Sequence, residues 1–365
     1  MNFIKNVFER FEIEGTLKTA EPFGDGHIND TYLVRVEEGT EVKKYIFQRI
    51  NRNAFKDVQG LMKNFAAVTE YFKKRLAAEG RDVAREVLSL VYTKDGKSYY
   101  EDEDGGAWRV TLYVARSRSY TMKTSPEQIY ESTLAFGKFQ KALKDFPADT
   151  LSETIPDFHN TKKRFRALLD AAEKNVLSRL DSVKAEYEFA LAREEFCNTL
   201  EDLKSAGVLP LRVTHNDTKL NNVLFDTDTD KAICVIDLDT VMPGLSVNDF
   251  GDAVRASTST AAEDEVDLSK VNFDMELYEL AVRGFLDGTA GSLTEAEIHQ
   301  MPTAAIMMTL ECGIRFLTDY LAGDVYFKIS RPEHNLDRAR NQFKLVSEME
   351  KRIEEMHNIV NKYSH

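Results

Sequence analysis

The spacing of apolar residues changes about a third of the way along the chain. Before that point, apolar and polar residues alternate over short stretches, which predicts β-strands at 31–36, 43–50 and 108–114. Two further stretches, 87–92 and 98–101, flank an Asp-Gly turn signal and are predicted to form a hairpin. The first third of the chain is therefore expected to be rich in antiparallel sheet.

Helical spacing of apolar residues appears first at 53–75 and then dominates the rest of the chain. Beyond residue 115 the predicted helices are 126–144, 160–180, 185–206, 247–257, 275–287, 295–300, 302–321 and 336–361. Short strands and loops at 211–238 interrupt them. The pattern predicts a small N-terminal lobe over residues 1–115, with a sheet and one helix, and a larger, mainly helical lobe over residues 116–365.

Composition narrows the class of protein. The 365-residue chain is 42% hydrophobic and 30% charged, which is typical of a globular protein long enough for two domains. A net charge of −13 argues against general nucleic-acid binding, which depends on basic surface. No apolar run approaches transmembrane length, so we expect no membrane partner. Three widely spaced cysteines and a start without a signal-peptide core predict a cytoplasmic protein with reduced thiols. The oligomeric state is not visible in the sequence, and we expect either a monomer or a homodimer.

The stretch 213–224, V-T-H-N-D-T-K-L-N-N-V-L, contains polar residues in the spacing H-x-D-x-K-x-x-N. An apolar stretch that ends in Asp237 follows it. This combination is typical of the catalytic loop and the metal-binding strand of a kinase. It predicts an α+β, two-lobed, protein-kinase-like fold with the catalytic loop at 213–224 and the metal strand at 232–239. The alternative, an Asx-rich turn between two strands, explains the residue types but not their spacing.

Each of these residue types suits phosphoryl transfer. Asp217 is the candidate base for the attacking hydroxyl, and Lys219 is placed to reach the transferring phosphate. Asn222 and Asp237 offer the hard oxygen ligands that Mg²⁺ prefers. His215 is expected to hold the loop by hydrogen bonds. ATP and Mg²⁺ are therefore the predicted nucleotide and cation.

Candidates for nucleotide binding lie in the small lobe. Gly24 and Gly26, in F-G-D-G-H-I-N-D-T-Y, could let the backbone approach phosphates, although Gly-Asp-Gly is also an ordinary turn. The next strand, Y-I-F-Q-R-I, lacks the lysine that pairs with phosphates in kinases. Gln48 or Arg49 takes its place, and the two point to opposite faces of the strand. Glutamine is a poor substitute for a cation, which leaves a catalytically weak pseudokinase as an alternative.

Several motifs resemble a known family. H-N-D-T-K-L-N-N followed by I-D-L-D-T-V-M-P-G resembles the aminoglycoside phosphotransferase and choline kinase superfamily. G-D-G-H-I-N-D-T-Y, F-Q-R-I-N-R-N-A-F-K-D and E-C-G-I-R-F-L-T-D-Y-L-A-G-D-V-Y-F resemble the N-acetylhexosamine 1-kinase group within it. These motifs extend from about residue 20 to residue 345, so the resemblance covers nearly the whole chain.

The resemblance implies an ATP- and Mg²⁺-dependent kinase that phosphorylates the anomeric hydroxyl of a GlcNAc- or GalNAc-like sugar. It implies sugar contacts from His27, Arg315 and Tyr326, and a metal or sugar contact from Asp239. It also implies that Asp249 braces the catalytic loop through backbone N–H groups.

Other interpretations stay open. Arg315 could form an ion pair with Glu311, four residues earlier on the same helix. His27 could brace its loop, and Tyr326 could be a packing aromatic. The reaction could be that of another superfamily member acting on an aminoglycoside, choline or methylthioribose. A cationic acceptor, such as an aminoglycoside or choline, would require several carboxylates around its site.

Overall fold

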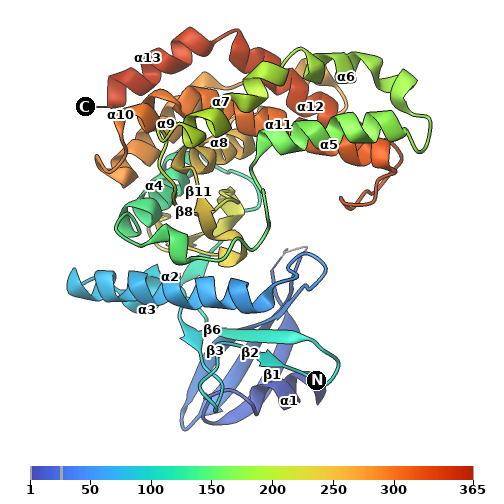
Figure 1. Cartoon of the computed structure of the whole chain (residues 1–365). Coiled ribbons are helices and arrows are strands. Elements are labelled where there is room, and N and C mark those ends of the chain that lie inside the picture. Colours follow the sequence, from blue (N-terminus) through green and yellow to red (C-terminus); the bar gives the residue numbers. More distant parts are fainter. Residues whose placement is uncertain (1, 25–27, 365) are drawn as a thin grey trace. The chain divides into compact units, whose positions relative to one another are not determined.

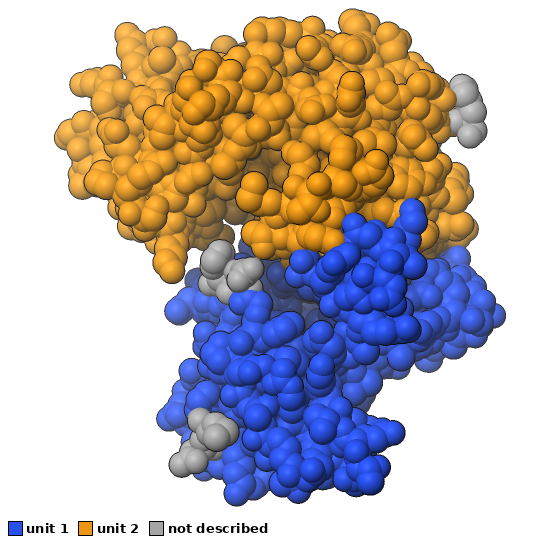
Figure 2. Space-filling model, turned by 180° about the vertical axis from the view of Figure 1, so that it is seen from behind, with its two compact units in different colours: residues 1–119, 145–156, 224–243 blue, residues 120–144, 157–223, 244–365 orange. Residues whose placement is uncertain are grey.

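The computed structural model describes residues 2–24 and 28–364. The chain forms two compact units, coloured separately in Figure 2. The first unit comprises Met1–Ser119, Asp145–Pro156 and Leu224–Pro243, and the second comprises Tyr120–Lys144, Asp157–Val223 and Gly244–His365. The sequence pattern predicted that the chain divides into two lobes once, at residue 115. Two later segments of the chain instead pack with the N-terminal part, and the division into 1–115 and 116–365 stays a prediction.

An antiparallel sheet dominates the first unit (Figure 1). Its order is β1-β2-β3-β6-β4, and β5 also pairs with β6. The strands are β1 (Thr16–Pro22), β2 (Asp30–Glu38), β3 (Glu41–Ile50), β4 (Leu90–Val91), β5 (Tyr100–Glu101) and β6 (Ala107–Leu112). The sequence pattern predicted β2, β3 and β6 and missed β1, whose residues are mostly exposed and do not alternate clearly.

The two faces of this sheet have different partners. Helix α1 (Asn2–Phe8) contributes Ile4 and Val7 to an apolar cluster with Phe47 and Trp108. Helix α2 (Val58–Ala78) runs along the other face (Figure 1). Its Phe65 ring contacts the side chain of Arg109 on β6. A short helix, α3 (Val83–Glu86), follows. Strand alternation therefore separates an apolar α1 face from an α2 face that also carries polar side chains.

The predicted hairpin is partly wrong. The turn exists, because the N–H of Gly96 donates to the carbonyl of Thr93 at 2.8 Å. The flanking strands do not pair with each other. Leu90 pairs with Thr111, and Tyr100 pairs with Trp108, so both strands extend from β6. Strands of two residues can form few backbone hydrogen bonds with each other. Each of them pairs with the longer strand β6 instead.

A second sheet has three strands in the order β10-β9-β7, and it joins β7, at the end of the N-terminal segment, to β9 and β10 of a later segment. The elements are β7 (Ser117–Arg118), the short helix η1 (Ala148–Thr150), β9 (Val223–Asp226), β10 (Ala232–Val235), the short helix η4 (Leu238–Thr240) and β11 (Met242–Gly244). Helix α2 binds both returning segments, since the Asn64 amide donates to the carbonyls of Ser152 at 2.7 Å and Val241 at 3.0 Å.

The second unit is mainly helical (Figure 1). Its elements are α4 (Glu127–Ala142), α5 (Thr161–Lys174), η2 (Leu180–Val183), α6 (Lys184–Leu191), α7 (Glu194–Ser205), β8 (Arg212–Thr214), η3 (Leu220–Asn222), α8 (Ser246–Ser257), η5 (Leu268–Lys270), α9 (Met275–Thr289), α10 (Glu295–His299), α11 (Met301–Ala322), α12 (His334–Glu350) and α13 (Ile353–Tyr363). Helix α11 is buried along nearly its whole length and packs against α5, α8 and α12.

Glycines let helices approach each other closely at two contacts. A side chain at Gly251 on α8 would collide with the carbonyl of Ala304 on α11. A side chain at Gly137 on α4 would meet the backbone of Phe285 on α9. These contacts fix the positions of α4 and α8, which hold the candidate catalytic loop.

Two predicted helices are broken in the structure. The stretch 185–206 divides into α6 and α7, with the guanidinium of Arg193 at the break 3.4 Å from the Phe189 ring centroid. The stretch 336–361 divides into α12 and α13. Apolar periodicity continues through both breaks, which is why the sequence did not indicate them. The α+β, protein-kinase-like fold class is confirmed, with an antiparallel sheet, one long helix on it and a larger helical region.

The cysteines are free, as the sequence indicated. Burial raises the pKa of the Cys197 and Cys234 thiols to about 12 and that of Cys312 to about 11. Among residues 2–24 and 28–364, no helix combines the length and the apolarity that a membrane crossing requires.

Candidate active site

The candidate catalytic loop follows β8 and is anchored by buried residues. His215 has no exposed surface, and its ring lies edge-on to Phe136 and Phe139 of α4. Its Nδ1 accepts a hydrogen bond from the N–H of Asp217 at 3.3 Å. Asn216 between them has a φ of 64°, a left-handed conformation that asparagine tolerates. The contacts of His215 match the bracing role predicted for it.

Two carboxylates of α8 hold the loop by its backbone. Asp249 accepts hydrogen bonds from the N–H groups of His215 at 2.9 Å and Asn216 at 2.8 Å. The Gln140 side chain of α4 donates to the same carboxylate at 2.7 Å. The predicted bracing role of Asp249 is therefore confirmed.

Sequence reasoning missed the second carboxylate. Asp252 lies one turn further along α8 and accepts from the N–H of Thr218 at 2.9 Å and from Arg255 at 3.0 Å. Burial would raise its pKa, but the charges of Arg255 and Lys219 lower it. The D-F-G-D spacing puts both carboxylates on one helix face, and this could have indicated from the sequence that Asp252 also holds the loop.

Three candidate residues meet at the tip of the loop. The Lys219 ammonium forms an ion pair with Oδ1 of Asp217 at 2.6 Å. The Asn222 amide donates to Oδ2 of Asp217 at 2.9 Å and to its backbone carbonyl at 2.8 Å. Burial would lower the pKa of Lys219, but the charges of Asp217 and Asp252 raise it, so the lysine is a cation at neutral pH. The structure thus joins the predicted base, the predicted phosphate cation and one predicted metal ligand.

The donor set fits the implied Mg²⁺. The Asn222 amide nitrogen is committed to Asp217, which leaves the amide oxygen as the atom that can bind a cation. Asp237 ends the β10 segment in a left-handed conformation with a φ of 59°. The described residues contain no cluster of three His, Cys, Asp or Glu ligands. A kinase Mg²⁺ site does not require one, because phosphates and water complete the coordination.

Arg315 and Tyr326, both predicted to contact the acceptor, lie together. The Arg315 guanidinium lies 5.4, 5.5 and 6.0 Å from the ring centroids of Phe158, Phe327 and Tyr326. The carboxylate of Asp319 holds the segment by accepting from the N–H groups of residues 325–327. Tyr326 itself is 68% exposed. Aromatic faces beside an arginine therefore form an open surface at the end of α11.

The alternative ion pair between Arg315 and Glu311 is not formed among the described residues. The Glu311 carboxylate instead lies 2.9 Å from Nδ1 of His159 and accepts from the Thr161 hydroxyl at 2.7 Å. Nε2 of His159 lies 3.0 Å from the carbonyl oxygen of Asn216 in the catalytic loop. Sequence reasoning missed His159, because nothing in its neighbourhood indicates a partner so far away in the chain.

The nucleotide-side residues belong to the first unit. Gln48 lies on the α2 face of β3, where its amide oxygen accepts from Arg109 at 2.9 Å. Arg49 lies on the opposite face, beside Gly106 and Asp102. Gly24 has a φ of 79°, and a Cβ there would meet nothing within 4 Å. Gly26 and His27 lie outside the described residues.

Asp239, a predicted metal or sugar contact, already has two partners. Its Oδ1 accepts from the Arg109 guanidinium, and its Oδ2 accepts from the Asn29 amide at 2.6 Å. With both oxygens occupied, Asp239 is the weakest member of the proposed metal set.

A family model described as "Phosphotransferase enzyme family" matches residues 19–279. The chain belongs to this family. The match includes the glycine segment, the candidate catalytic loop, both α8 carboxylates and the first turn of α9. The prediction of a phosphotransferase is confirmed at the level of this family.

Solved structures show that the phosphotransferase shares its fold with distant proteins. An aminoglycoside phosphotransferase from Alicyclobacillus acidocaldarius is 14% identical, with 96% of each chain covered and a TM-score of 0.61. A choline kinase from Cryptosporidium parvum is 14% identical, with 100% of this chain and 99% of that chain covered and a TM-score of 0.60. A spectinomycin phosphotransferase in complex with ADP and spectinomycin is 13% identical, with 97% and 98% covered and a TM-score of 0.58.

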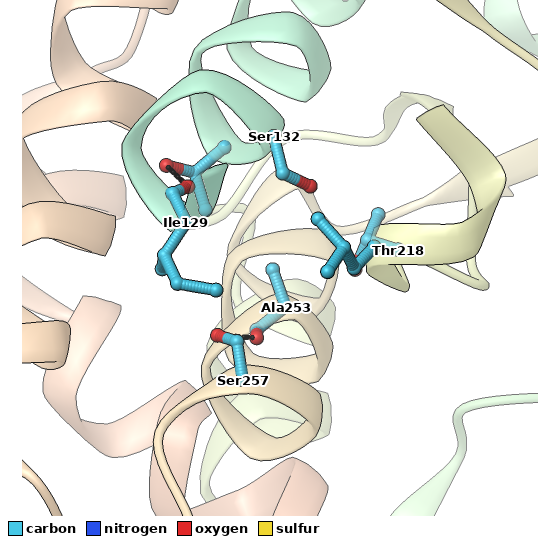
Figure 3. A pocket seen from close by; sticks show the side chains of 7 residues that line it. Ile129, Ser132, Thr218, Ala253 and Ser257 are labelled. Atoms are coloured by element: carbon cyan, nitrogen blue, oxygen red, sulfur yellow. Dashed lines mark hydrogen bonds between the residues drawn. The ribbon is translucent and has the colours of Figure 1, made fainter. Parts of the chain in front are cut away.

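One small hollow lies next to the candidate catalytic loop. Residues from α4, α8 and the loop line it, including Ser132, Thr218 and Ser257 (Figure 3). Its volume of about 10 Å³ has room for about one water molecule. The hollow is therefore a packing feature of the loop and does not provide space for a substrate.

Proposed function

We propose that the protein is an ATP-dependent kinase that phosphorylates the anomeric hydroxyl of an N-acetylhexosamine. The observation that carries the proposal is the arrangement at Asp217, where Lys219 and Asn222 bind the carboxylate and two α8 carboxylates hold the loop. The products are the sugar 1-phosphate and ADP.

Asp217 is the group that receives the proton. As the sugar oxygen attacks the γ-phosphorus, its proton passes to the Asp217 carboxylate and the bond to the β,γ-bridging oxygen breaks. Lys219, whose side chain is 44% exposed, would exchange its ion pair with Asp217 for the transferring phosphate. Asn222 and Asp237 would hold Mg²⁺, which neutralises charge on the phosphates.

The surface around Arg315 supports a sugar as the acceptor. Aromatic rings offer flat apolar surface to a pyranose, and the guanidinium donates directional hydrogen bonds to hydroxyl or acetamido oxygens. Arg164 lies close enough that burial and the Arg315 charge lower its pKa. Two arginines near the acceptor would repel cationic aminoglycosides or choline, which argues for a neutral sugar. The choice of an N-acetylhexosamine among neutral sugars rests on the resemblance to the N-acetylhexosamine 1-kinase group.

Nucleotide use is supported by the glycine segment and by a fold relative that binds ADP. In this proposal Gly24 and Gly26 admit the phosphates to the backbone, and His27 contacts the sugar. Gln48, whose amide is bonded to a neighbouring strand, cannot by itself supply the missing phosphate cation.

The test is ADP release by the full chain with Mg·ATP and a panel of N-acetylglucosamine, N-acetylgalactosamine, glucose, galactose, choline, methylthioribose and kanamycin. We expect turnover with the acetamido sugars and none with their 1-O-methyl glycosides. Activity only on a cationic acceptor would contradict the sugar assignment. Bound nucleotide without turnover on any acceptor would instead favour the pseudokinase.

Asp217→Asn serves as the internal check on the chemistry. Loss of the proton acceptor should lower kcat by about 10²- to 10⁴-fold while Mg·ADP still binds. Asp202→Asn is the matched control, because Asp202 is exposed and pairs only with Lys162 on the surface. Near wild-type turnover by Asp217→Asn would show that the base is another residue.

A further inference from the structure

A row of polar side chains crosses the α2 face of the first unit's sheet. The strand register places Thr31 of β2 opposite Gln48 of β3, and Gln48 opposite Arg109 of β6. Hydrogen bonds follow the row, from Arg109 to Gln48 at 2.9 Å and from Gln48 to Thr31 at 3.2 Å. A cation is therefore present on this face, one strand away from the position where a kinase places its lysine.

Arg109 is almost completely buried. Its exposed fraction is 1%, and that of its partner Asp239 is 2%. The guanidinium lies over the Phe65 ring of α2, 4.7 Å from its centroid. A buried ion pair stabilises a fold no better than apolar residues of similar size, so its presence calls for another reason.

The partner of Arg109 leads to the segment that follows the glycines. Asp239, two residues after the proposed metal ligand Asp237, accepts from the Asn29 amide at 2.6 Å. The amide oxygen of Asn29 accepts from the N–H of Asn51 at the end of β3 at 2.9 Å. Asn29 is therefore held on one side by the β3 end and on the other by a carboxylate that Arg109 orients.

We propose that Arg109 is a positioning residue for nucleotide binding that supplies from β6 the buried cation missing from β3. Through Asp239 and Asn29 it holds the backbone that leads from the glycine segment into β2. The same contact fixes η4, directly after Asp237. The inference rests on the proposed kinase function, and it assigns Asp239 to positioning rather than to metal binding.

The test measures nucleotide binding without an acceptor. Titration calorimetry of Mg·ADP gives Kd, and thermal unfolding of the same samples gives Tm. We expect Arg109→Gln and Asp239→Asn each to raise Kd at least about tenfold, because small displacements of a binding segment are costly. The Kd of the double variant should be no higher than that of either single variant, because each substitution breaks the same ion pair. Arg109→Lys should retain part of the affinity.

Two further variants make the test specific. Asn29→Ala breaks the contacts of Asn29 with Asp239 and with the N–H of Asn51 but removes no buried charge, so it should raise Kd while Tm changes little. Combining Gln48→Lys with Arg109→Gln returns a cation to β3 in the same row, and it should recover affinity relative to Arg109→Gln alone. Arg81→Gln is the control, because Arg81 forms an exposed ion pair with Glu86.

The outcomes separate the possible failures. Lower Tm with unchanged Kd in every variant would mean that the ion pair is purely structural and would overturn the inference. If Arg109→Gln does not fold, Asn29→Ala decides the matter alone, and wild-type Kd in that variant overturns the inference. A wild-type chain that binds Mg·ADP but phosphorylates no sugar defeats the sugar assignment and leaves this test intact. A wild-type chain that binds no Mg·ADP defeats both.

Discussion

Buried His159 connects helix α11, which carries the proposed acceptor residue Arg315, with the candidate catalytic loop. One ring nitrogen faces the Glu311 carboxylate at 2.9 Å, and the other lies 3.0 Å from the carbonyl of Asn216, the residue before the proposed base. Burial would lower the pKa of His159, but the Glu311 charge raises it, with a further contribution from Asp252. Burial would raise the pKa of Glu311, but the charge and hydrogen bond of His159, together with the Arg315 charge and the Thr161 hydrogen bond, lower it.

These shifts predict a stability difference that depends on pH. The raised pKa of His159 contributes stability that is complete below its unfolded value of 6.5 and is lost as pH rises through the folded value. The lowered pKa of Glu311 contributes stability that is complete above its unfolded value of 4.5. His159→Gln should therefore reduce the free energy of unfolding most at pH 5–6, by about 3–5 kcal/mol, and less as pH rises beyond 7.

Denaturant unfolding of both proteins across pH 5–9 measures this difference. His299→Gln is the control, because His299 is exposed on α10 and should show a small difference that does not follow the same curve. A His159→Gln deficit that stays constant from pH 5 to pH 9 would show that His159 is neutral in the folded protein.

Residue roles were predictable where the partners are close in sequence. The spacing within 213–224 placed Asp217 and Asn222 together, and Asp249 followed from the family pattern. His159 and Arg109 were not predictable, because their partners lie 152 and 130 residues away. A buried histidine and a strand arginine each look like ordinary packing until the fold brings a carboxylate to them.

Among the helices, α11 has the most direct link to function. Glu311 and Arg315 lie about one turn apart on it, and Glu311 reaches the catalytic loop through His159 while Arg315 faces aromatic rings. A displacement of this helix would therefore affect both the acceptor surface and the loop. Gly251 on α8, pressed against the backbone of α11, restricts such a displacement.

Arg315→Ala should separate acceptor binding from nucleotide binding. Loss of a charged hydrogen-bond donor should raise the KM of the sugar about tenfold to a hundredfold and leave the KM of ATP nearly unchanged. Steady-state kinetics with each substrate varied in turn provide the measurement. Arg166→Ala is the control, because Arg166 on α5 is exposed and its ion pair is confined to that helix. Equal increases in both KM values would assign Arg315 a structural role.

Elements with strong periodicity were predicted correctly, and their breaks were not. Residues 302–321 and 275–287 correspond closely to α11 and α9. The division of 185–206 and of 336–361 into two helices each arises where a tertiary contact changes the chain direction while the apolar spacing continues. The pairing of β4 and β5 with β6 likewise depends on the whole sheet, which local turn signals do not describe.

At the scale of the molecule, the order of predicted elements, a sheet followed by helices, predicted the fold class. It did not predict that the chain passes more than once from one unit to the other. Residues 145–156 and 224–243 return to the first unit after the chain has entered the second. Their contacts with residues 1–119 include the pairing of β7 with β9 and individual hydrogen bonds and ion pairs, such as Arg85 with Asp226 at 2.7 Å. Such contacts leave no periodic pattern in the sequence.

A fragment comprising residues 1–119 should therefore fail to fold on its own. It contains β1 to β6, yet Arg109 would be buried without Asp239, and Asn64 without the carbonyls of Ser152 and Val241. We expect no cooperative thermal transition by circular dichroism and poor dispersion of amide NMR signals. Adding a peptide of residues 224–243 should restore part of the structure. A cooperative transition in the fragment alone would contradict this prediction.

The same return of the chain sets an order of events during translation. The ribosome makes the sheet first, but the carboxylate that neutralises its buried arginine emerges only when about two thirds of the 365 residues have been made. Until then the nascent sheet holds a charge that favours water over the interior, so it stays open. The sheet, which is synthesised first, thus needs a later segment of the chain before it can fold fully. We therefore expect it to fold after most of the chain has emerged and not in the order of synthesis.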